Sequence, residues 1–166
     1  MPEPNFPEDL QVPLLLKPIL GGSIQPTIII DPDGPPTTVI PEKTNFVVRV
    51  EWNLVSPGPG GHALLLMIHN PLNVFTVRVA FESIGATPEH DATFTGALVA
   101  TSSAAVVPGP KPGQWQIPMH DNVAVPAGVL PVGAYLMTAY LTFTASGVPE
   151  PIAGISDERL VEIFPV

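Results

Sequence analysis

The chain has 166 residues, no cysteine and a formal net charge of −9 from 15 acidic and 6 basic side chains. This length suits one domain with an additional arm, and the absence of cysteine excludes disulfides, zinc–thiolate sites and a cysteine nucleophile. The acidic charge argues against a nucleic-acid-binding protein, which needs a basic face to meet phosphates. It also argues against docking on anionic lipid.

The N-terminus is acidic and interrupted by prolines, and it lacks the basic region of a secretory signal peptide. The apolar run at residues 14–20 contains Lys17 and Pro18 and is too short to span a bilayer. We therefore expect no membrane span and a cytoplasmic location. Export by a route other than general secretion stays open.

Residues 1–43 are predicted to form an extended, proline-rich arm. Ten of the 23 prolines fall within the first 41 residues, and each one fixes the backbone dihedral φ and removes an N–H donor. An arm of this kind could fold back on its own domain, where edge strands need cover, or dock on a second copy or another protein. It carries apolar side chains that a free linker would not need: Phe6, Leu10, Leu14, Leu15, Leu16, Ile19 and Leu20.

Residues 44–166 are predicted to form a β-sandwich domain. Alternating apolar residues, which are typical of half-buried strands, occupy residues 46–54, 75–82 and 135–144. In the first of these segments, Trp52 falls on the apolar face and Arg49 and Glu51 fall on the polar face. Weaker strands are expected at 24–30, 63–69, 93–100, 115–117, 122–125 and 160–164. Turns rich in glycine and proline separate these segments, so the pattern predicts an all-β, antiparallel, two-sheet sandwich.

Two segments resemble the immunoglobulin-like and fibronectin-III-like class of β-sandwich. The first, residues 48–52 (VRVEW), is similar to an early strand with an inward tryptophan. The second, residues 130–137 (LPVGAYLM), looks like a tyrosine corner, in which the Tyr135 hydroxyl would bond to upstream backbone. The resemblance covers roughly residues 44–166 and implies a fold but no particular activity, because this sandwich serves many unrelated functions.

Two histidine–aspartate pairs are the weak candidates for a metal site: His90 with Asp91, and His120 with Asp121. Imidazole and carboxylate are common ligands of divalent metals. The two pairs lie far apart in the sequence and have no short-range ligand spacing, so solvated loop residues are the favoured interpretation. We therefore expect no metal and no cofactor.

The chain has no recognisable catalytic motif, neither a nucleophile elbow nor a phosphate-binding loop. Glu51 and Glu82 lie close to Arg49 and Arg78 on outward faces, where cross-strand ion pairs are expected rather than acid–base chemistry. Trp115 could present a flat face to a sugar, although a tryptophan packed against the core is the favoured interpretation.

The sequence thus favours a non-catalytic structural or interaction module that assembles with itself or docks into a larger complex. Its contacts would come from the arm and from apolar side chains on the outer sheet faces, because exposed apolar patches usually mark interfaces. Two other hypotheses stay open: a carbohydrate-binding or small-ligand-binding module built on Trp115, and a metal-dependent protein built on the His–Asp pairs. The outward apolar residues are Val47, Val55, Val74, Leu136 and Tyr140.

Overall fold

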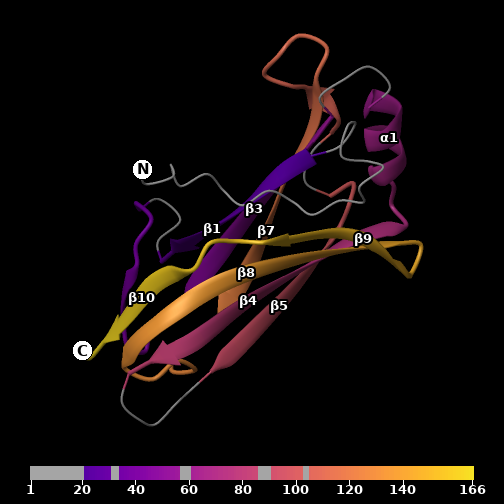
Figure 1. Cartoon of the computed structure of the whole chain (residues 1–166). Coiled ribbons are helices and arrows are strands. Elements are labelled where there is room, and N and C mark those ends of the chain that lie inside the picture. The colour runs from indigo at the N-terminus through magenta and orange to yellow at the C-terminus, as the bar shows by residue number, and fades with distance from the viewer. Residues whose placement is uncertain (1–20, 31–33, 57–60, 86–90, 103–104) are drawn as a thin grey trace.

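Two β-sheets packed face to face form the body of the protein, with a short helix across one end (Figure 1). The computed structural model describes residues 21–30, 34–56, 61–85, 91–102 and 105–166. Within these ranges the chain is an all-β sandwich, as the sequence predicted. The predicted arm residues Phe6, Leu10, Leu14, Leu15, Leu16, Ile19 and Leu20 lie outside the described residues, and so does His90.

Sheet A has the strand order β1-β3-β7-β6, and its pairs are antiparallel. Strand β3 is the centre of this sheet, because it pairs with β1 on one side and with β7 along its whole length on the other. The strands are β1 (Gly21–Ile29), β3 (Phe46–Ser56), β6 (Val107–Pro108) and β7 (Trp115–Val125).

Sheet B has the strand order β2-β10-β8-β4-β5, and β9 pairs with the remaining part of β8. These pairs are antiparallel except for the parallel pair of β2 and β10, which departs from the purely antiparallel sandwich that the sequence predicted. The strands are β2 (Val39–Pro41), β4 (Asn73–Ile84), β5 (Ala92–Val99), β8 (Gly133–Ala145), β9 (Val148–Ile155) and β10 (Arg159–Phe164).

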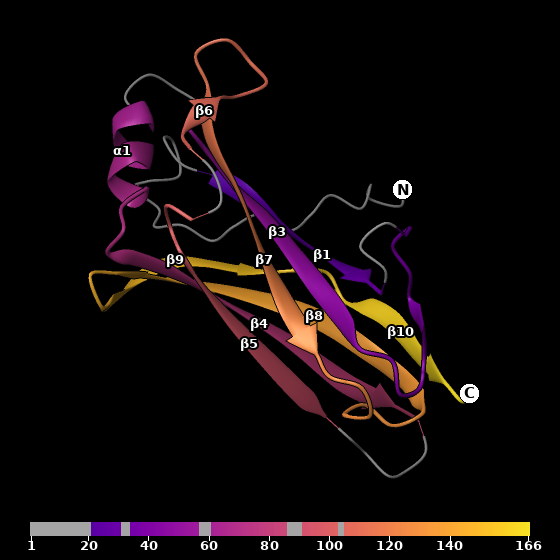
Figure 2. The same cartoon turned by 180° about the vertical axis from the view of Figure 1, so that it is seen from behind.

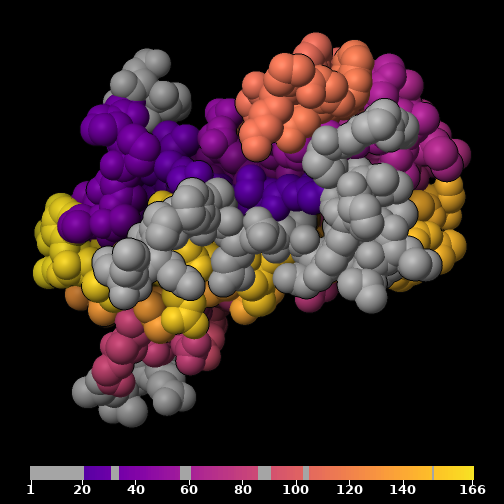
Figure 3. Space-filling model, turned by 45° about the horizontal axis from the view of Figure 1, so that its top comes forward, coloured from indigo at the N-terminus to yellow at the C-terminus, as the bar shows by residue number. Residues whose placement is uncertain are grey.

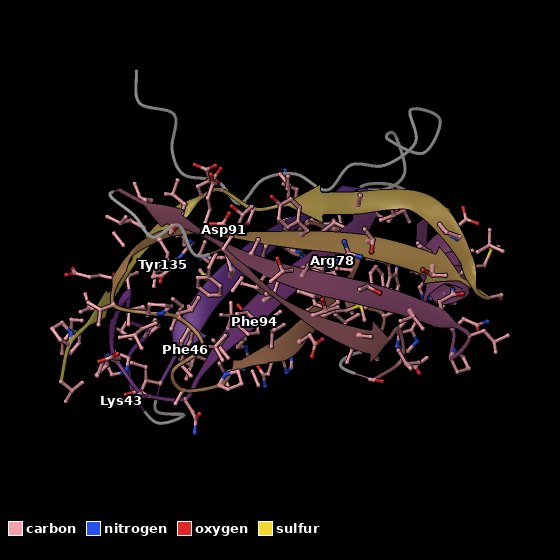
Figure 4. All side chains as sticks on the ribbon, turned by 90° about the horizontal axis from the view of Figure 1, so that it is seen from below. Lys43, Phe46, Arg78, Asp91, Phe94 and Tyr135 are labelled. Carbon is pink, nitrogen blue, oxygen red and sulfur yellow. The ribbon has the colours of Figure 1, made fainter. Side chains whose placement is uncertain are left out.

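The alternation of the three strongest strands gives the core its residues. On β3 the side chains of Phe46, Val48, Val50, Trp52 and Leu54 are all buried, as the sequence predicted for that face. They meet the inward faces of β4 and β8, where Phe81 is the centre of an aromatic cluster. Its ring lies 6.1 Å from Phe46, 5.9 Å from Phe94 and 6.5 Å from Tyr135, and these three neighbours lie at the same end of the sandwich (Figure 4).

Tyr135 makes the hydrogen bond that the sequence predicted. Its hydroxyl donates to the carbonyl oxygen of Pro131 at 2.7 Å, and the residue is only 2% exposed. Burial raises the pKa of the Tyr135 hydroxyl above its ordinary value of 10.0, because the charged phenolate is poorly solvated there. The bond ties the start of β8 to the preceding turn.

The strand expected at residues 63–69 is wrong, because this segment is the helix α1 (Gly61–Ile68). A continuous apolar run suits a strand that is buried on both faces, but it suits a helix equally well. Alanine, leucine and methionine are strong helix formers, and the buried residues Gly61, Leu65 and Ile68 follow helical spacing. The helix crosses the end of the sandwich and contacts β3 and β7 (Figures 1 and 2).

Proline within strands explains the other differences from the sequence prediction. Residues 115–117 and 122–125 were expected as two strands but belong to the single strand β7, which contains Pro118. Proline is tolerated there because only the first residues of β7 pair with β6, so its second edge is free over most of its length. Strands β2, β6 and β9 were not predicted, and each of them contains proline.

The later part of the predicted arm contributes strands to both sheets. The strand expected at 24–30 is present as β1, and it pairs with β3 from Gly21 opposite Val55 to Ile29 opposite Val47. Strand β2 joins sheet B through β10. The division of the chain at residues 43 and 44 stays a prediction.

Candidate interaction site

A groove runs along the seam where β1 of sheet A faces β9 and β10 of sheet B, and its volume is about 810 Å³. Strand β1 uses one edge to pair with β3, and no described strand pairs with its other edge. The groove therefore lies beside a strand edge that no described strand covers, on the strand that directly follows residues 1–20.

A break in the edge of sheet B forms the opposite wall of the groove. Strand β8 pairs with β10 through residues 133–137 and with β9 through residues 140–145, so Ala139 lies between the two pairings. There the hydroxyl oxygen of Ser156 accepts a hydrogen bond from the Ala139 N–H at 2.9 Å, and the Ser156 N–H donates to the Ala139 carbonyl at 2.9 Å. The hydroxyl of the buried Ser156 thus takes the place of a backbone carbonyl as the acceptor for the Ala139 N–H. The residues after Ser156 can therefore turn away from the sheet.

The lining of the groove combines apolar and charged side chains. Tyr140 and Ile155 are 38% and 44% exposed, and both belong to the lining. Asp157, Glu158 and Arg159 follow directly at the break, so the wall offers an apolar surface beside charges of both signs. A surface of this composition can hold an extended peptide through backbone pairing and side-chain contacts.

The outer sheet faces are less apolar than the sequence predicted. Val47, Val55, Val74 and Leu136 are half-buried, whereas Tyr140 is exposed. On sheet B, Arg78 lies on the outer face between Thr95 of β5 and Tyr140 of β8 in the strand register (Figure 4).

The expected cross-strand ion pairs are not the ones observed. The Arg49 guanidinium Nε lies 2.9 Å from the Glu51 Oε1 atom on the same strand, and both side chains are substantially exposed. Glu82 and Arg78 form no ion pair within the described part of the chain. An exposed pair of this kind contributes about 0–1 kcal/mol to the free energy of unfolding. It gives no indication that Glu51 takes part in acid–base chemistry.

The described metal candidates do not come together. Asp91 is exposed, and its Oδ1 atom accepts a hydrogen bond from the Ser83 N–H at 3.0 Å. His120 and Asp121 are neighbours on β7 and therefore face opposite sides of the sheet. Among the described residues no three histidine or carboxylate side chains gather as a metal site would require.

Asp121 occupies an unexpected position for a carboxylate. It falls on the inward face of β7, and its Oδ2 atom is buried with no hydrogen-bond partner in the described structure. A Cβ on Gly96 of the facing strand β5 would lie only 2.4 Å from this oxygen, so glycine makes room for the carboxylate. Sequence reasoning assigned Asp121 to a loop and missed the contact between the two sheets.

Trp115 packs against the protein rather than standing free. Its ring stacks on His62 at a centroid distance of 4.0 Å and an interplanar angle of 25°, and it contacts the edge of the core. His62 comes from the first turn of α1, so one face of the indole is already covered. A short turn closed by a 2.8 Å bond from the Gly109 N–H to the Gln114 carbonyl projects from the surface near α1 (Figure 3).

Exposed apolar side chains also gather at the helical end of the molecule, where the sequence predicted a buried strand. Leu66 and Met67 of α1 are 50% and 71% exposed. Leu72 follows the helix, and its carbonyl accepts a hydrogen bond from Ser146 at the β8–β9 turn, close to exposed Val148. The signal in the sequence is the same apolar run, whose buried residues Gly61, Leu65 and Ile68 follow helical spacing.

The comparisons with known proteins give no family for the chain. No family model matches it, and no curated protein matches it. A solved structure that matches is a bacterial adhesin from Mobiluncus mulieris containing intramolecular disulfide, isopeptide and ester bond cross-links. The match has 10% identity and a TM-score of 0.41, and it covers 85% of this chain and 49% of the adhesin chain.

The chain thus spans about half the length of that adhesin structure. The cytoplasmic location expected from the sequence gains no support from the comparisons. Within the described residues, no helix is both long and apolar enough to cross a membrane.

Proposed function

We propose that the protein is a non-catalytic interaction module of the immunoglobulin-like class, and that its N-terminal arm docks in the groove between β1 and the β9–β10 break of a second copy or of a partner protein. The observation that carries this proposal is the groove itself, because it joins a free strand edge to an apolar and charged wall. Residues 1–20 directly precede β1 in the sequence, so the arm is joined to the strand that borders the groove.

The composition of the arm suits this groove. The run Leu14, Leu15 and Leu16 contains no proline, so its backbone can donate hydrogen bonds to a strand edge. Lys17 follows the leucines and complements the acidic Asp157 and Glu158 at the groove wall. Backbone pairing would supply the affinity, and the apolar and charged contacts would supply the specificity.

The immunoglobulin-like assignment is supported by the strand order and by one side chain. Sheet A orders its strands as β1-β3-β7-β6 and sheet B places β8 between β4 and β10, an arrangement that corresponds to the two sheets of such sandwiches. The bond of Tyr135 to Pro131 is the hydrogen bond expected of a tyrosine corner. This class of fold supports an interaction role without identifying a partner.

Binding of a synthetic peptide tests the docking step. The peptide comprises residues 1–20, and the acceptor is the chain beginning at Gly21, which keeps β1. We expect saturable binding by isothermal titration calorimetry, and we expect Ile155→Asp to weaken it at least about tenfold because a charge would enter the apolar wall. Val148→Asp is the matched control, since Val148 is an exposed apolar residue of the same strand outside the groove lining.

Solution mass by light scattering distinguishes docking between molecules from docking within one. At one dilute protein concentration, the full chain should be larger than a monomer, whereas the chain beginning at Gly21 and the triple variant Leu14→Ser, Leu15→Ser, Leu16→Ser should be monomeric. A peptide that does not bind would refute the groove as the acceptor. A peptide that binds while the full chain stays monomeric would place the arm on its own domain.

A further inference from the structure

Most edges of the two sheets carry proline, which cannot donate a hydrogen bond to an added strand. Among the described strands, β1 contains Pro26, β2 ends at Pro41, β6 contains Pro108, and β9 contains Pro149. The free edge of β7 beyond its pairing with β6 contains Pro118. Each of these edges therefore lacks at least one N–H donor that a long pairing with a second chain would need. The residues of β1 other than Pro26 keep their N–H groups, so a short segment such as the arm can still pair there.

Strand β5 is the exception among the described edge strands. Its eight residues (ATFTGALV) include neither proline nor a charged side chain. It pairs with β4 along its whole length, from Ala92 opposite Phe81 to Val99 opposite Val74, and no described strand pairs with its other edge. A long, uncharged edge of this kind is a template for strand pairing unless something covers it.

The inward face of β5 is incompletely covered by its own domain. Phe94 and Leu98 are only partly buried and pack against the rim of the core. In the facing sheet A, Asp121 of β7 lies against Gly96 of β5. The next strand of sheet A, β6, is only two residues long, so sheet A extends little beyond the position of β5. An added strand would cover the open sides of Phe94 and Leu98.

We propose that β5 pairs in an antiparallel manner with β5 of a second copy about a two-fold axis, so that the two sheets B join into one continuous sheet. The occupant is a second copy because the edge is self-complementary under such an axis and because β5 is free of charge in a chain whose net charge is −9. Self-repulsion disfavours contact between most other surfaces of two such chains.

The geometry restricts the register of this pairing. Residues opposite each other in an antiparallel pair point to the same face. The exposed residues Thr93, Thr95, Ala97 and Val99 must therefore oppose one another, and inward residues must oppose inward residues. One residue of β5 therefore lies opposite its own copy, and the two-fold axis passes midway between these two copies.

The interface uses a surface other than the groove, so it does not rest on the proposed function. We expect the chain beginning at Gly21 to dimerise at raised concentration by sedimentation equilibrium. The double variant Thr93→Lys, Ala97→Lys should raise the dissociation constant at least about tenfold, because edge lysines oppose strand pairing and like charges would meet across the axis. Since these lysines reduce the net negative charge, general repulsion could not explain the loss.

The matched control is Thr142→Lys, Thr144→Lys, which places the same charge on the outer face of the central strand β8. It should leave the dissociation constant unchanged, and circular dichroism should show that all variants are folded. A chain beginning at Gly21 that stays monomeric at millimolar concentration, or an edge variant that dimerises like its parent, would overturn the proposal. Failure of peptide 1–20 to bind would leave this result unaffected.

Oxidative cross-linking gives a second test, because the chain has no cysteine of its own. Single variants Thr93→Cys, Thr95→Cys and Ala97→Cys should form disulfide dimers, fastest at the residue nearest the axis, since a disulfide requires Cβ atoms about 4 Å apart. Thr142→Cys should cross-link far more slowly. Equal rates at all four positions would show random collision and would contradict the pairing.

Discussion

Tyr135 combines a buried ring with a hydroxyl that holds the turn before β8. We expect Tyr135→Phe to lower the free energy of unfolding by about 0.5–1.5 kcal/mol, because it removes one hydrogen bond and leaves the ring in place. Urea denaturation at pH 7 measures the change. Tyr140→Phe is the control, since Tyr140 lies on the exposed outer face, and an equal loss in both variants would contradict the role of the Tyr135 hydroxyl.

The pH dependence of stability gives an independent test of the same residue. Burial raises the pKa of Tyr135 in the folded protein above 10.0, so the fold favours the neutral phenol. This contribution is fully present below the pKa of the unfolded chain and is lost as the pH rises through the folded pKa. We expect the wild-type free energy of unfolding to fall more steeply above pH 10 than that of Tyr135→Phe, and parallel curves would contradict the prediction.

Gly61 is required where the end of β3 meets the start of α1. A Cβ at this position would lie 1.2 Å from the Ser56 hydroxyl oxygen and 2.1 Å from the Ser56 Cβ. We expect Gly61→Ala to destabilise the protein by about 1–3 kcal/mol through this overlap. Gly21→Ala, which meets nothing within 4 Å, should have little effect, and the double variant Ser56→Gly, Gly61→Ala should recover part of the loss in urea denaturation.

The burial or hydrogen bond of a single residue was predictable from the sequence where one local pattern determines it. The inward position of Trp52 follows from strand alternation, and the bond of Tyr135 follows from its position at the start of a strand. Asp121 and Trp115 were not predictable in this way. Their partners, Gly96 and His62, come from distant segments of the chain, so only the packing of the elements brings them together.

Secondary structure followed the sequence wherever apolar residues alternated over a long segment. Strands β3, β4, β5 and β8 were expected close to their observed bounds. The errors have two physical sources. A continuous apolar run does not distinguish a helix from a buried strand, which led to the wrong strand in place of α1. Pro118 falls in the gap between the strands expected at 115–117 and 122–125, although an edge strand tolerates proline, as β7 shows.

Strand β1 is an integral element of sheet A, and its removal has a predictable result. Ile24 and Ile28 are 1% and 3% exposed, and each buried isoleucine contributes about 1.5–3 kcal/mol to the free energy of unfolding. A chain beginning at Thr44 should therefore be unfolded or strongly destabilised, whereas a chain beginning at Gly21 should keep a cooperative thermal transition. Equal melting temperatures for the two chains would contradict the structural role of β1.

The whole molecule carries a net charge of −9, which opposes the approach of two copies. Salt screens this repulsion, since the Debye length falls from about 30 Å at 0.01 M to about 10 Å at 0.1 M. We expect self-association of the full chain to strengthen as sodium chloride rises over this range, and sedimentation velocity measures it. Weaker association at higher salt would instead indicate that ion pairs, such as one to Lys17, dominate the contact.

The parallel pairing of β2 with β10 has a consequence for synthesis of the protein. Val39 pairs with Glu162, so a strand made early must wait for one of the last segments of the chain. At about 5–20 residues per second, translation imposes a delay on the order of 10 s. Pairing of β1 with β3 is local and is available much earlier. Sheet A can therefore begin to form while sheet B still lacks its C-terminal strand. Ile40 of β2, which is buried in the folded protein, stays uncovered and accessible to chaperones until that strand leaves the ribosome.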